Sequence, residues 1–258
     1  MTEEPTRARR LRLTDVEEWL RQGWSMFRAS APVSMAYASI FFILGLLLQA
    51  VIAGGGYGLI YFLFATGFPI LAPLLSVVFY HFAALIERGE KPGWGAIIAA
   101  IRHVPAAAWA VGMALVALYL IWITDALIIY SVYFRFDPIS FHEYFTNDRV
   151  SSDASSFVSY AGALGLVLTF VAFSIGVFSI PHAFSTRAGL VAAVVFSVSN
   201  VFRNFVVMMV WAAVLATVLT VTLLVAMPLG IVAFPVLSMA NAAAYRQLRE
   251  MHELPPAG

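Results

Sequence analysis

The stretch "FYHFAALIERGEKPGW", residues 79–94, is where this chain changes its surroundings. Residues 29–86 contain no Asp, Glu, Lys or Arg, and then Glu87, Arg88, Glu90 and Lys91 follow within five positions. A helix needs roughly 20 apolar residues to cross a hydrocarbon core, so the neutral run is long enough for two spans and a turn. The cluster "GGGYG" at 54–58 predicts that turn, because glycines permit a tight reversal.

The composition agrees with a membrane protein. The 258 residues are 62% hydrophobic and 11% charged, with a mean hydropathy of +0.88. Soluble domains carry about 25% charged residues, and a folded domain of this size keeps a large surface that must be covered by a solvent. Lipid is the natural solvent here, so we expect one membrane domain whose partner is the lipid bilayer.

Other classes of protein and site are disfavoured by the same counts. A net charge of +1 gives no electrostatic bias toward nucleic acid. The chain has no cysteine, which excludes disulfides, thiolate metal sites and cysteine nucleophiles. Motifs typical of hydrolases, metalloproteases and phosphate-binding loops are absent from the sequence. We therefore expect a non-enzymatic protein with no catalytic residue, metal or cofactor.

The hydrophobic runs predict six transmembrane helices. Prolines inside the second, fourth and sixth of them, at 69, 73, 181 and 235, predict kinks. The predicted spans cover about 32–53, 59–85, 105–130, 157–184, 205–226 and 229–246.

The basic residues predict the orientation of the spans. Of the 15 Lys and Arg residues, 13 fall in the N-terminal segment, in 87–104, in 187–204 and in the C-terminal tail. The other two, Arg135 and Arg149, lie in the 135–156 loop. Short loops rich in Lys and Arg stay in the cytoplasm, so both termini are predicted to be cytoplasmic.

An amphipathic segment precedes each pair of spans. The three segments cover residues 14–32, 91–105 and 185–204, and in each the apolar residues recur at steps of three and four. Thr14 and Glu17 form a capping-box pattern at the start of the first segment. Each segment is too short or too polar to cross lipid, which favours a helix lying in the membrane interface.

The predicted fold is therefore all-α: a polytopic membrane protein of three parallel hairpin repeats, each preceded by a cytoplasmic interfacial helix. Repeats that point the same way are related by an axis along the membrane normal. The predicted divisions are a flexible basic N-terminus, a membrane domain over 13–250, its three repeats and a C-terminal tail. The N-terminus covers 1–12, the repeats cover about 13–90, 91–186 and 187–250, and the tail covers 251–258.

Four stretches resemble a bacterial family of integral membrane proteins known only as domain of unknown function number 2189. They are "WLRQGWSMFRASAPVSMAYASIF" (19–41), "GFPILAPLLSVVFYHFAALIERGEKP" (67–92), "VFSIPHAFSTRAGLVAAVVFSVSNVFRNFVVMMVW" (177–211) and "VAFPVLSMANAAAYRQL" (232–248). The resemblance implies a multi-pass protein of the bacterial inner membrane and no established activity. Members usually have Asp before the arginine of the third stretch and histidines before "AYR" of the fourth. Here Thr186 and residues 240–244 stand there instead, so no role is carried over to them.

Charged and aromatic residues at the ends of the spans are candidate lipid contacts. Arg28, Arg102 and Arg203 each stand just before a span and are able to reach lipid phosphates, and Trp24 and Trp94 suit the interface. Asn200 and Asn204 flank Arg203, and the simpler interpretation of their two amides is that they cap the end of the helix.

Asp125 is the only carboxylate inside a predicted span. An acid within a membrane is a candidate contact for a proton or a cation. Asp125 is expected near the outer end of its span. The alternative interpretation is therefore an Asp in the membrane interface that is hydrogen-bonded locally.

Two histidines are candidate cofactor ligands. His81 lies six residues before Glu87, and His182 lies five residues before Arg187, which places both at a similar depth. A bis-imidazole haem or a quinone site requires such a pair. The other reading is that both are wall residues near helix ends, and we expect them to touch no metal or cofactor.

Three functions remain open on this basis. The leading one is a non-catalytic scaffold or accessory subunit of a larger membrane complex, with other membrane-protein subunits as partners. The second is a transporter of small molecules or lipids, favoured by prolines that are able to line a cavity. The third is a haem- or quinone-binding subunit, which rests on the two histidines.

Overall fold

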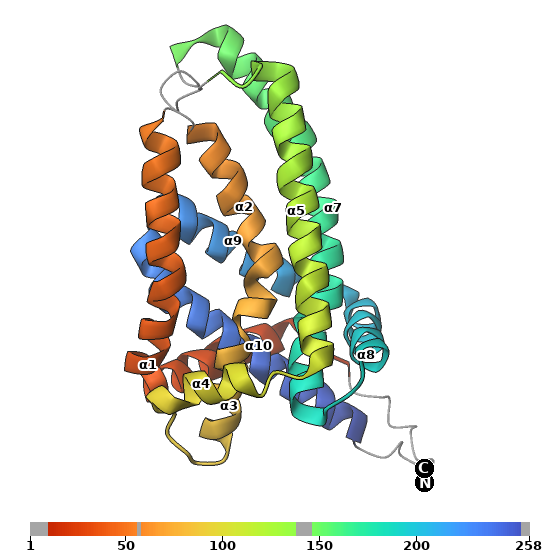
Figure 1. The fold of residues 1–258 in the computed structure, drawn as a ribbon. Helices are drawn as coiled ribbons and strands as arrows, with labels where there is room; N and C mark the ends of the chain where they lie inside the picture. Colours follow the sequence, from red (N-terminus) through yellow and green to blue (C-terminus); the bar gives the residue numbers. More distant parts are fainter. Residues whose placement is uncertain (1–9, 56–57, 138–145, 254–258) are drawn as a thin grey trace.

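A computed structural model of the chain describes residues 10–55, 58–137 and 146–253, and this part is helical with no strand (Figure 1). The predicted all-α class is confirmed. Parts of four predicted features lie outside the described residues. These are the basic N-terminus (1–9), the glycine turn (56–57), the loop between the third and fourth spans (138–145) and the C-terminal tail (254–258).

Five helices of the described part are long and apolar enough to cross a membrane, and a sixth crossing results if a bent pair of helices is one span. The bent pair is α2 (Gly58–Leu75) and α3 (Val77–Glu87), which meet at 44°. The five others are α1 (Leu13–Gly54), α5 (Ala106–Phe134), α7 (Asp148–Thr186), α9 (Phe205–Val225) and α10 (Met227–Glu253).

The segments predicted to precede the hairpins are all helical. Helix α1 breaks at Ser30 (φ −130°, ψ 16°), so its first part leaves the direction of the span that follows. The other two segments are α4 (Trp94–Arg102) and α8 (Leu190–Arg203). Figure 1 shows the first part of α1 and α4 lying across the lower end of the upright helices. The cytoplasmic location of these helices and the threefold repeat stay predictions.

Three sequence-based details are corrected by the structure. Helix α1 begins before Thr14, and Asp15 instead accepts a hydrogen bond from the Arg12 backbone N–H (2.7 Å), since an acid three residues into a helix reaches back to the capping position. The second span bends at Ser76, three residues after Pro73, while both prolines lie inside continuous α2. Helix α7 starts at Asp148, nine residues before the predicted span, because a polar sequence outside lipid still forms helix.

Helix α1 packs against α10, and this is the most extensive helix pair of the structure. Gly23 permits the close approach: a Cβ atom there would lie 2.5 Å from the Val236 carbonyl oxygen. Trp19 is buried in the contact and its indole N–H donates to the Gln247 side chain (2.6 Å). Much of the apolar face predicted to lie in the interface is therefore covered by protein.

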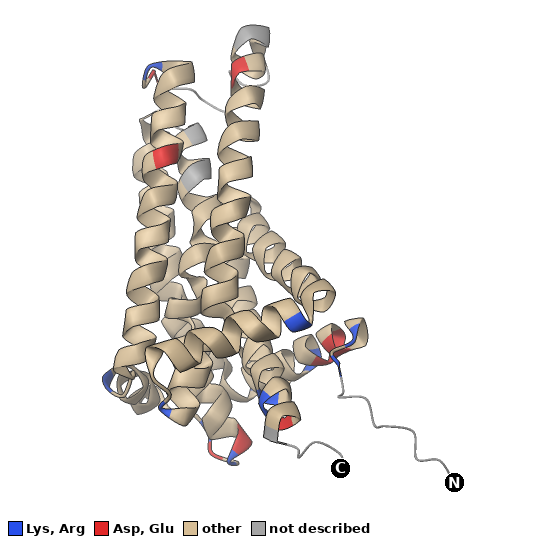
Figure 2. Cartoon of the chain, turned by 90° about the vertical axis from the view of Figure 1, so that its right-hand side faces the viewer, with Lys and Arg blue, Asp and Glu red and all other residues tan. Residues whose placement is uncertain are grey.

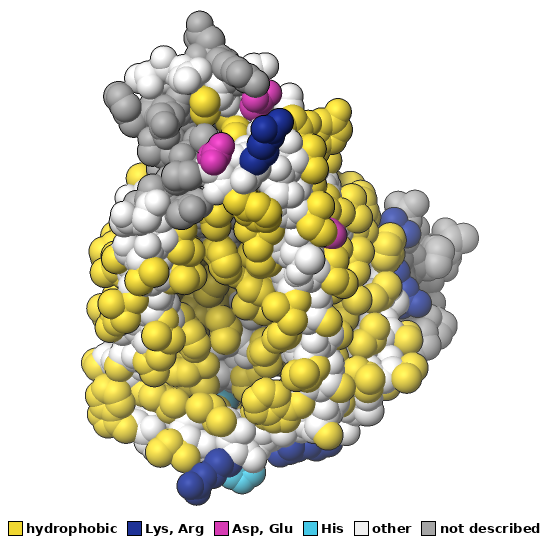
Figure 3. Space-filling view, turned by 45° about the horizontal axis from the view of Figure 1, so that its top comes forward, with side chains coloured by type: hydrophobic (Ala, Val, Ile, Leu, Met, Phe, Trp, Pro, Cys, Tyr) yellow, Lys and Arg dark blue, Asp and Glu magenta, His cyan; other side chains and the backbone are white. Residues whose placement is uncertain are grey.

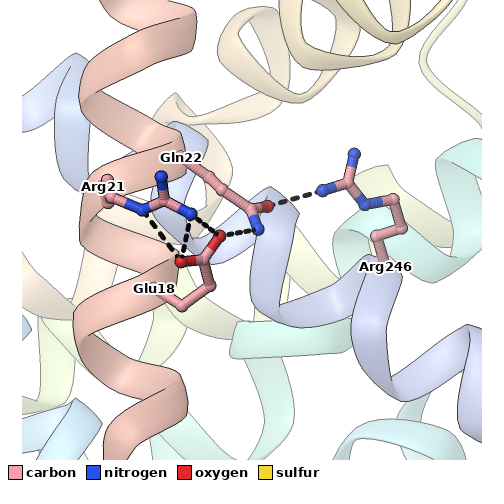
Figure 4. Close-up of polar contacts among 4 residues, drawn as sticks. All are labelled: Glu18, Arg21, Gln22 and Arg246. Carbon is pink, nitrogen blue, oxygen red and sulfur yellow. Dashed lines mark hydrogen bonds and ion pairs between the residues drawn. The ribbon is translucent and has the colours of Figure 1, made fainter.

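Charged side chains tie the helices together at the end where α1 begins and α10 finishes. The Arg246 guanidinium donates to the Glu87 carboxylate (2.7 Å) at the end of α3 and to the Gln22 side chain (2.5 Å) of α1. Gln22 donates in turn to Glu18, which also pairs with Arg21 (Figure 4). Figure 2 shows most of the charged residues at this end of the molecule, a smaller group at the opposite end and an acidic residue part-way along an upright helix.

Between the charged ends the molecule presents an apolar surface, as the hydrophobic side chains in Figure 3 show. Large exposed apolar residues occur on each of the long helices, among them Leu47 (58%), Met113 (64%) and Val206 (67%). Such a belt is unfavourable in water and suits lipid.

Candidate functional site

A cavity of about 260 Å³ lies between α2, α7, α9 and α10. Its walls are mainly apolar, and none of the described residues that line it is Asp, Glu, Lys, Arg or His. Helices α7 and α9 both pack against α2 and α10 but hardly against each other. On the rim, Leu166 of α7 is 75% exposed and Ala213 of α9 is exposed as well, so the cavity opens sideways between α7 and α9.

A second cavity of about 270 Å³ adjoins the first. The two share Pro69, Leu166, Thr169 and Ala216 in their walls. The second cavity continues along α7 toward Phe157 and is bounded by Trp122 of α5. From Val177 to Phe157 the helix rises about 30 Å, so together the cavities follow α7 over roughly the thickness of a hydrocarbon core.

Asn241 of α10 organises the polar end of the first cavity. Its side chain is 4% exposed and its amide N–H groups donate to the Tyr80 hydroxyl (3.1 Å) and to the Val177 carbonyl (2.8 Å). Its amide oxygen accepts from the Trp211 indole N–H (3.0 Å). One side chain thereby joins α3, α7, α9 and α10. Tyr80 lies seven residues before Glu87, about 10 Å along the helix from the charged end.

Two serines complete the polar end. The hydroxyls of Ser76 and Ser238 lie 2.8 Å apart, Ser76 also lies 2.7 Å from the Ala72 carbonyl, and Ser238 lies 2.8 Å from the Phe234 carbonyl. Ser76 stands at the break between α2 and α3, where its hydroxyl bonds to the last turn of α2. Both serines are buried, and both line the cavity with Tyr80 and Asn241.

The polar cluster of Ser76, Tyr80, Ser238 and Asn241 was not among the predicted site residues. One signal for it exists in the sequence: "PLLS" at 73–76 and "PVLS" at 235–238 place a serine three residues after a proline in two different spans. The structure brings these two serines into contact. For Tyr80 and Asn241 we find no comparable pattern in the sequence.

The two candidate histidines do not line the cavity. His81 is half-buried and makes an edge contact with Phe184, with ring centroids 5.8 Å apart. His182 stacks on Phe196 at 4.1 Å and its Nδ1 lies 3.2 Å from the Tyr245 hydroxyl. Phe184 is two residues from His182, so the two histidines lie on helices that meet here. Within the described residues, no three His, Cys, Asp or Glu side chains gather closely enough to hold a metal ion.

A chain of hydroxyls ends at His182. The Tyr245 hydroxyl lies 2.5 Å from the Ser185 hydroxyl, and Ser185 and Thr186 both donate to the His182 carbonyl. The imidazole itself contacts the tyrosine and no serine or aspartate among the described residues. This group lies outside the cavity and close to the charged end of α7.

The predicted interface residues lie on the surface of the molecule. Arg28, Arg102 and Arg203 are exposed, and none of them has an ion pair with a described residue. Trp24 is 46% exposed and Trp94 is 63% exposed. The structure places these five on three different helices, α1, α4 and α8, and their contact with lipid stays a prediction.

Asn200 and Asn204 belong to the junction of α8 and α9. The Asn200 side chain donates to the Phe196 carbonyl (2.7 Å), and that of Asn204 donates to the Asn200 carbonyl (3.2 Å). Asn204 also accepts from the Leu11 backbone N–H (3.2 Å), which ties the start of the described chain to this junction.

Asp125 is half-buried on α5, nine residues before the helix ends, and it does not line either cavity. No hydrogen bond or ion pair joins its carboxylate to a described residue. A role for Asp125 in contacting a proton or a cation stays a prediction.

A family model matches part of the chain. Residues 60–184 match the family model described as "Predicted integral membrane protein (DUF2189)". The match confirms the predicted resemblance over the second stretch and the start of the third, and it ends before both positions at which the sequence departs from the family pattern. No curated protein and no solved structure matches the chain.

Proposed function

We propose that this protein has a non-catalytic accessory role in the bacterial inner membrane, with both termini in the cytoplasm. The match of residues 60–184 to a family of predicted integral membrane proteins supports the membrane location. In this role the protein holds a membrane-soluble molecule between α2, α7, α9 and α10. The observation that carries the proposal is the cavity of about 260 Å³, which has apolar walls and a few converging buried polar groups. Cavities of this kind are the usual sites for small ligands.

The position of the opening supports a ligand that arrives from lipid. The rim residues Leu166 and Ala213 are exposed on the apolar belt, where no water reaches them in a bilayer. A molecule dissolved in the membrane enters from there without passing a polar surface. A charged solute would have to lose its hydration first, at a cost of several kcal/mol.

The chemistry of the cavity supports a role in binding. General acid–base catalysis needs a titrating group within reach of the ligand, and the described lining residues carry amide and hydroxyl groups, with tyrosine as the sole acid. The accessory role predicts that other membrane-protein subunits co-purify with the protein after cross-linking in native membranes.

Transport of a lipid or a small molecule is a second candidate, favoured by the 44° bend beside the cavity. Ser76 stands at this bend and lines the cavity, so a change of angle between α2 and α3 would alter the polar end of the site. Flux of a labelled lipid across vesicles containing the protein distinguishes this from holding. A haem-binding role draws no support from the cavity, because neither histidine lines it.

The proposal is tested by filling the cavity. Ala216 lines both cavities, and Ala216→Trp places a large side chain between them. Ala163→Trp is the matched control on the exposed surface of α7, outside both walls. Mass spectrometry of solvent extracts is expected to find a molecule bound about one to one to the unaltered protein and to the control, and lost from Ala216→Trp. Equal retention by both variants, or only bulk lipid throughout, rules the proposal out.

A further inference from the structure

The polar end of the cavity identifies the class of ligand, an inference that rests on the proposed function. We propose that the ligand has an uncharged head group with a carbonyl oxygen, which accepts a hydrogen bond from the Tyr80 hydroxyl, and an apolar tail that runs along α7 through the second cavity. Isoprenoid quinones and neutral glycerides both have this chemistry.

The walls of both cavities lack charged side chains among the described residues. Neither cavity has an Asp, Glu, Lys, Arg or His among the described residues that line it. A phosphate or an ammonium group placed there would be buried without a counter-charge, which is far more costly than burying a neutral polar group. The site therefore selects against ordinary charged phospholipid head groups and in favour of neutral ones.

Most hydrogen-bond donors at the polar end of the cavity already have acceptors within the protein. Both N–H groups of Asn241 are used, by the Tyr80 oxygen and the Val177 carbonyl. The hydroxyl hydrogens of Ser76 and Ser238 have the Ala72 and Phe234 carbonyls as acceptors. Asn241 positions the Tyr80 oxygen by donating to it, and the phenol keeps its own hydrogen to give.

Ser76 lines the same polar end of the cavity as Tyr80, and its hydroxyl already contacts the Ala72 carbonyl and the Ser238 hydroxyl. A carbonyl oxygen entering the cavity is a better acceptor for the phenol than a hydroxyl engaged twice. Tyr80 is 6% exposed, so this donor is presented in a water-poor site, where a hydrogen bond is strong.

The shape of the site favours a ligand with an extended tail. The joined cavities follow about 30 Å of α7 and are walled beyond the polar end by residues such as Phe173, Leu219 and Trp122. An extended hydrocarbon or isoprenoid tail fits such a channel. Thr169 marks the joint of the two cavities, about 12 Å along the helix from Val177, which is too far for its hydroxyl to serve the same head group.

The test measures binding of three probes to the protein in lipid nanodiscs: an isoprenoid benzoquinone, a diacylglycerol, and a phosphatidic acid with the same acyl chains. Tyr80→Phe is expected to weaken the better neutral probe about three- to tenfold, the value of one hydrogen bond. Tyr160→Phe removes the same hydroxyl from an exposed tyrosine of α7 that lines neither cavity, and it is expected to leave that affinity unchanged. The stronger of the two neutral probes identifies the source of the ligand.

The outcomes separate this inference from the function on which it rests. Phosphatidic acid binding as tightly as diacylglycerol, or no effect of Tyr80→Phe beside a full loss in Ala216→Trp, overturns the head-group assignment and leaves the binding function standing. Binding of no probe overturns the inference, and the extraction experiment with Ala216→Trp then decides whether the binding function stands. If Tyr80→Phe does not fold, the infrared band of a ¹³C-labelled carbonyl in the bound probe decides: a band at the position found in hydrocarbon solvent overturns the inference, and a lowered one supports it.

Discussion

At the scale of single residues, Asn241 determines how four helices meet. Its amide satisfies the Trp211 indole N–H, the Val177 carbonyl and the Tyr80 hydroxyl, all of them in buried surroundings. A buried polar group left without a partner costs about 1–3 kcal/mol. The network therefore both closes the polar end of the cavity and penalises any arrangement of these helices that separates its members.

Replacement of Asn241 by leucine is expected to destabilise the protein by about 2–4 kcal/mol, because three buried groups lose their partner at once. Asn200→Leu is the matched control. Asn200 is equally buried, but its side chain bonds to the Phe196 carbonyl of its own helix, so a loss of about 1 kcal/mol is expected. Unfolding in mixed micelles with increasing dodecyl sulfate, followed by circular dichroism, measures both. Equal losses would contradict the central role of Asn241.

The candidate site was only in part accessible from the sequence. Hydrophobic periodicity indicates which face of a helix is apolar, but it does not indicate which helices pack against each other. Tyr80 and Asn241 lie 161 positions apart, and Ser76 and Ser238 lie 162 apart. Histidine is a common cofactor ligand, so the sequence alone marks it as a candidate, whereas a tyrosine or an asparagine in a span becomes a candidate only through its place beside a cavity.

At the scale of elements, the contact between α1 and α10 depends on a residue without a side chain. A Cβ atom at Gly23 would lie 2.5 Å from the Val236 oxygen and 2.7 Å from the Ala240 nitrogen, both backbone atoms. Backbone atoms of a packed helix are not free to move aside as the end of a flexible side chain does. The two helices must therefore separate to admit even a methyl group.

Gly23→Ala is accordingly expected to lower stability by about 1–3 kcal/mol, despite the higher helix propensity of alanine. Gly95→Ala provides the control, since a Cβ atom at Gly95 of α4 would meet nothing within 4 Å. That variant is expected to be neutral or slightly stabilising. Thermal unfolding of the two purified variants measures the difference, and an unchanged midpoint for Gly23→Ala would show that α1 and α10 do not pack closely.

The elements themselves were largely predictable, with errors that have physical causes. The fifth span, expected at 205–226, is Phe205–Val225, because Asn204 and the sequence "MPLG" mark its ends. The fourth was expected at 157–184, yet the helix begins at Asp148. Hydropathy measures where lipid ends, and a helix is free to continue into water. The second span is bent by 44°, and the bend lies at Ser76, three residues after Pro73.

At the scale of the whole molecule, the charges at the two ends define an axis for the membrane. Most charged residues lie at the end that carries Arg246, Glu87 and the start of α1 (Figure 2). The opposite end includes Asp137 and Asp153. Positively charged segments are retained in the cytoplasm, so the end that carries Arg246 is expected to face inward.

Single cysteines test this orientation, because the chain has none of its own. Glu90→Cys and Ser152→Cys each replace an exposed residue, at opposite ends of the molecule. A membrane-impermeant maleimide applied to cells with a permeabilised outer membrane is expected to label Ser152→Cys at once. Glu90→Cys is expected to react only after the inner membrane is opened. Reaction of Glu90→Cys alone from outside would reverse the proposed topology.

The pairing of α1 with α10 has a consequence for biosynthesis. Helix α1 ends at Gly54 and α10 begins at Met227, so the ribosome adds more than 170 residues after α1 before its partner exists. At 5–20 residues per second, this interval lasts roughly 10–35 s. During this interval the surface around Trp19 and Gly23 has no packing partner within the nascent chain. We therefore expect a chain that stalls before α10 to be degraded more readily than the complete protein, because this surface stays uncovered.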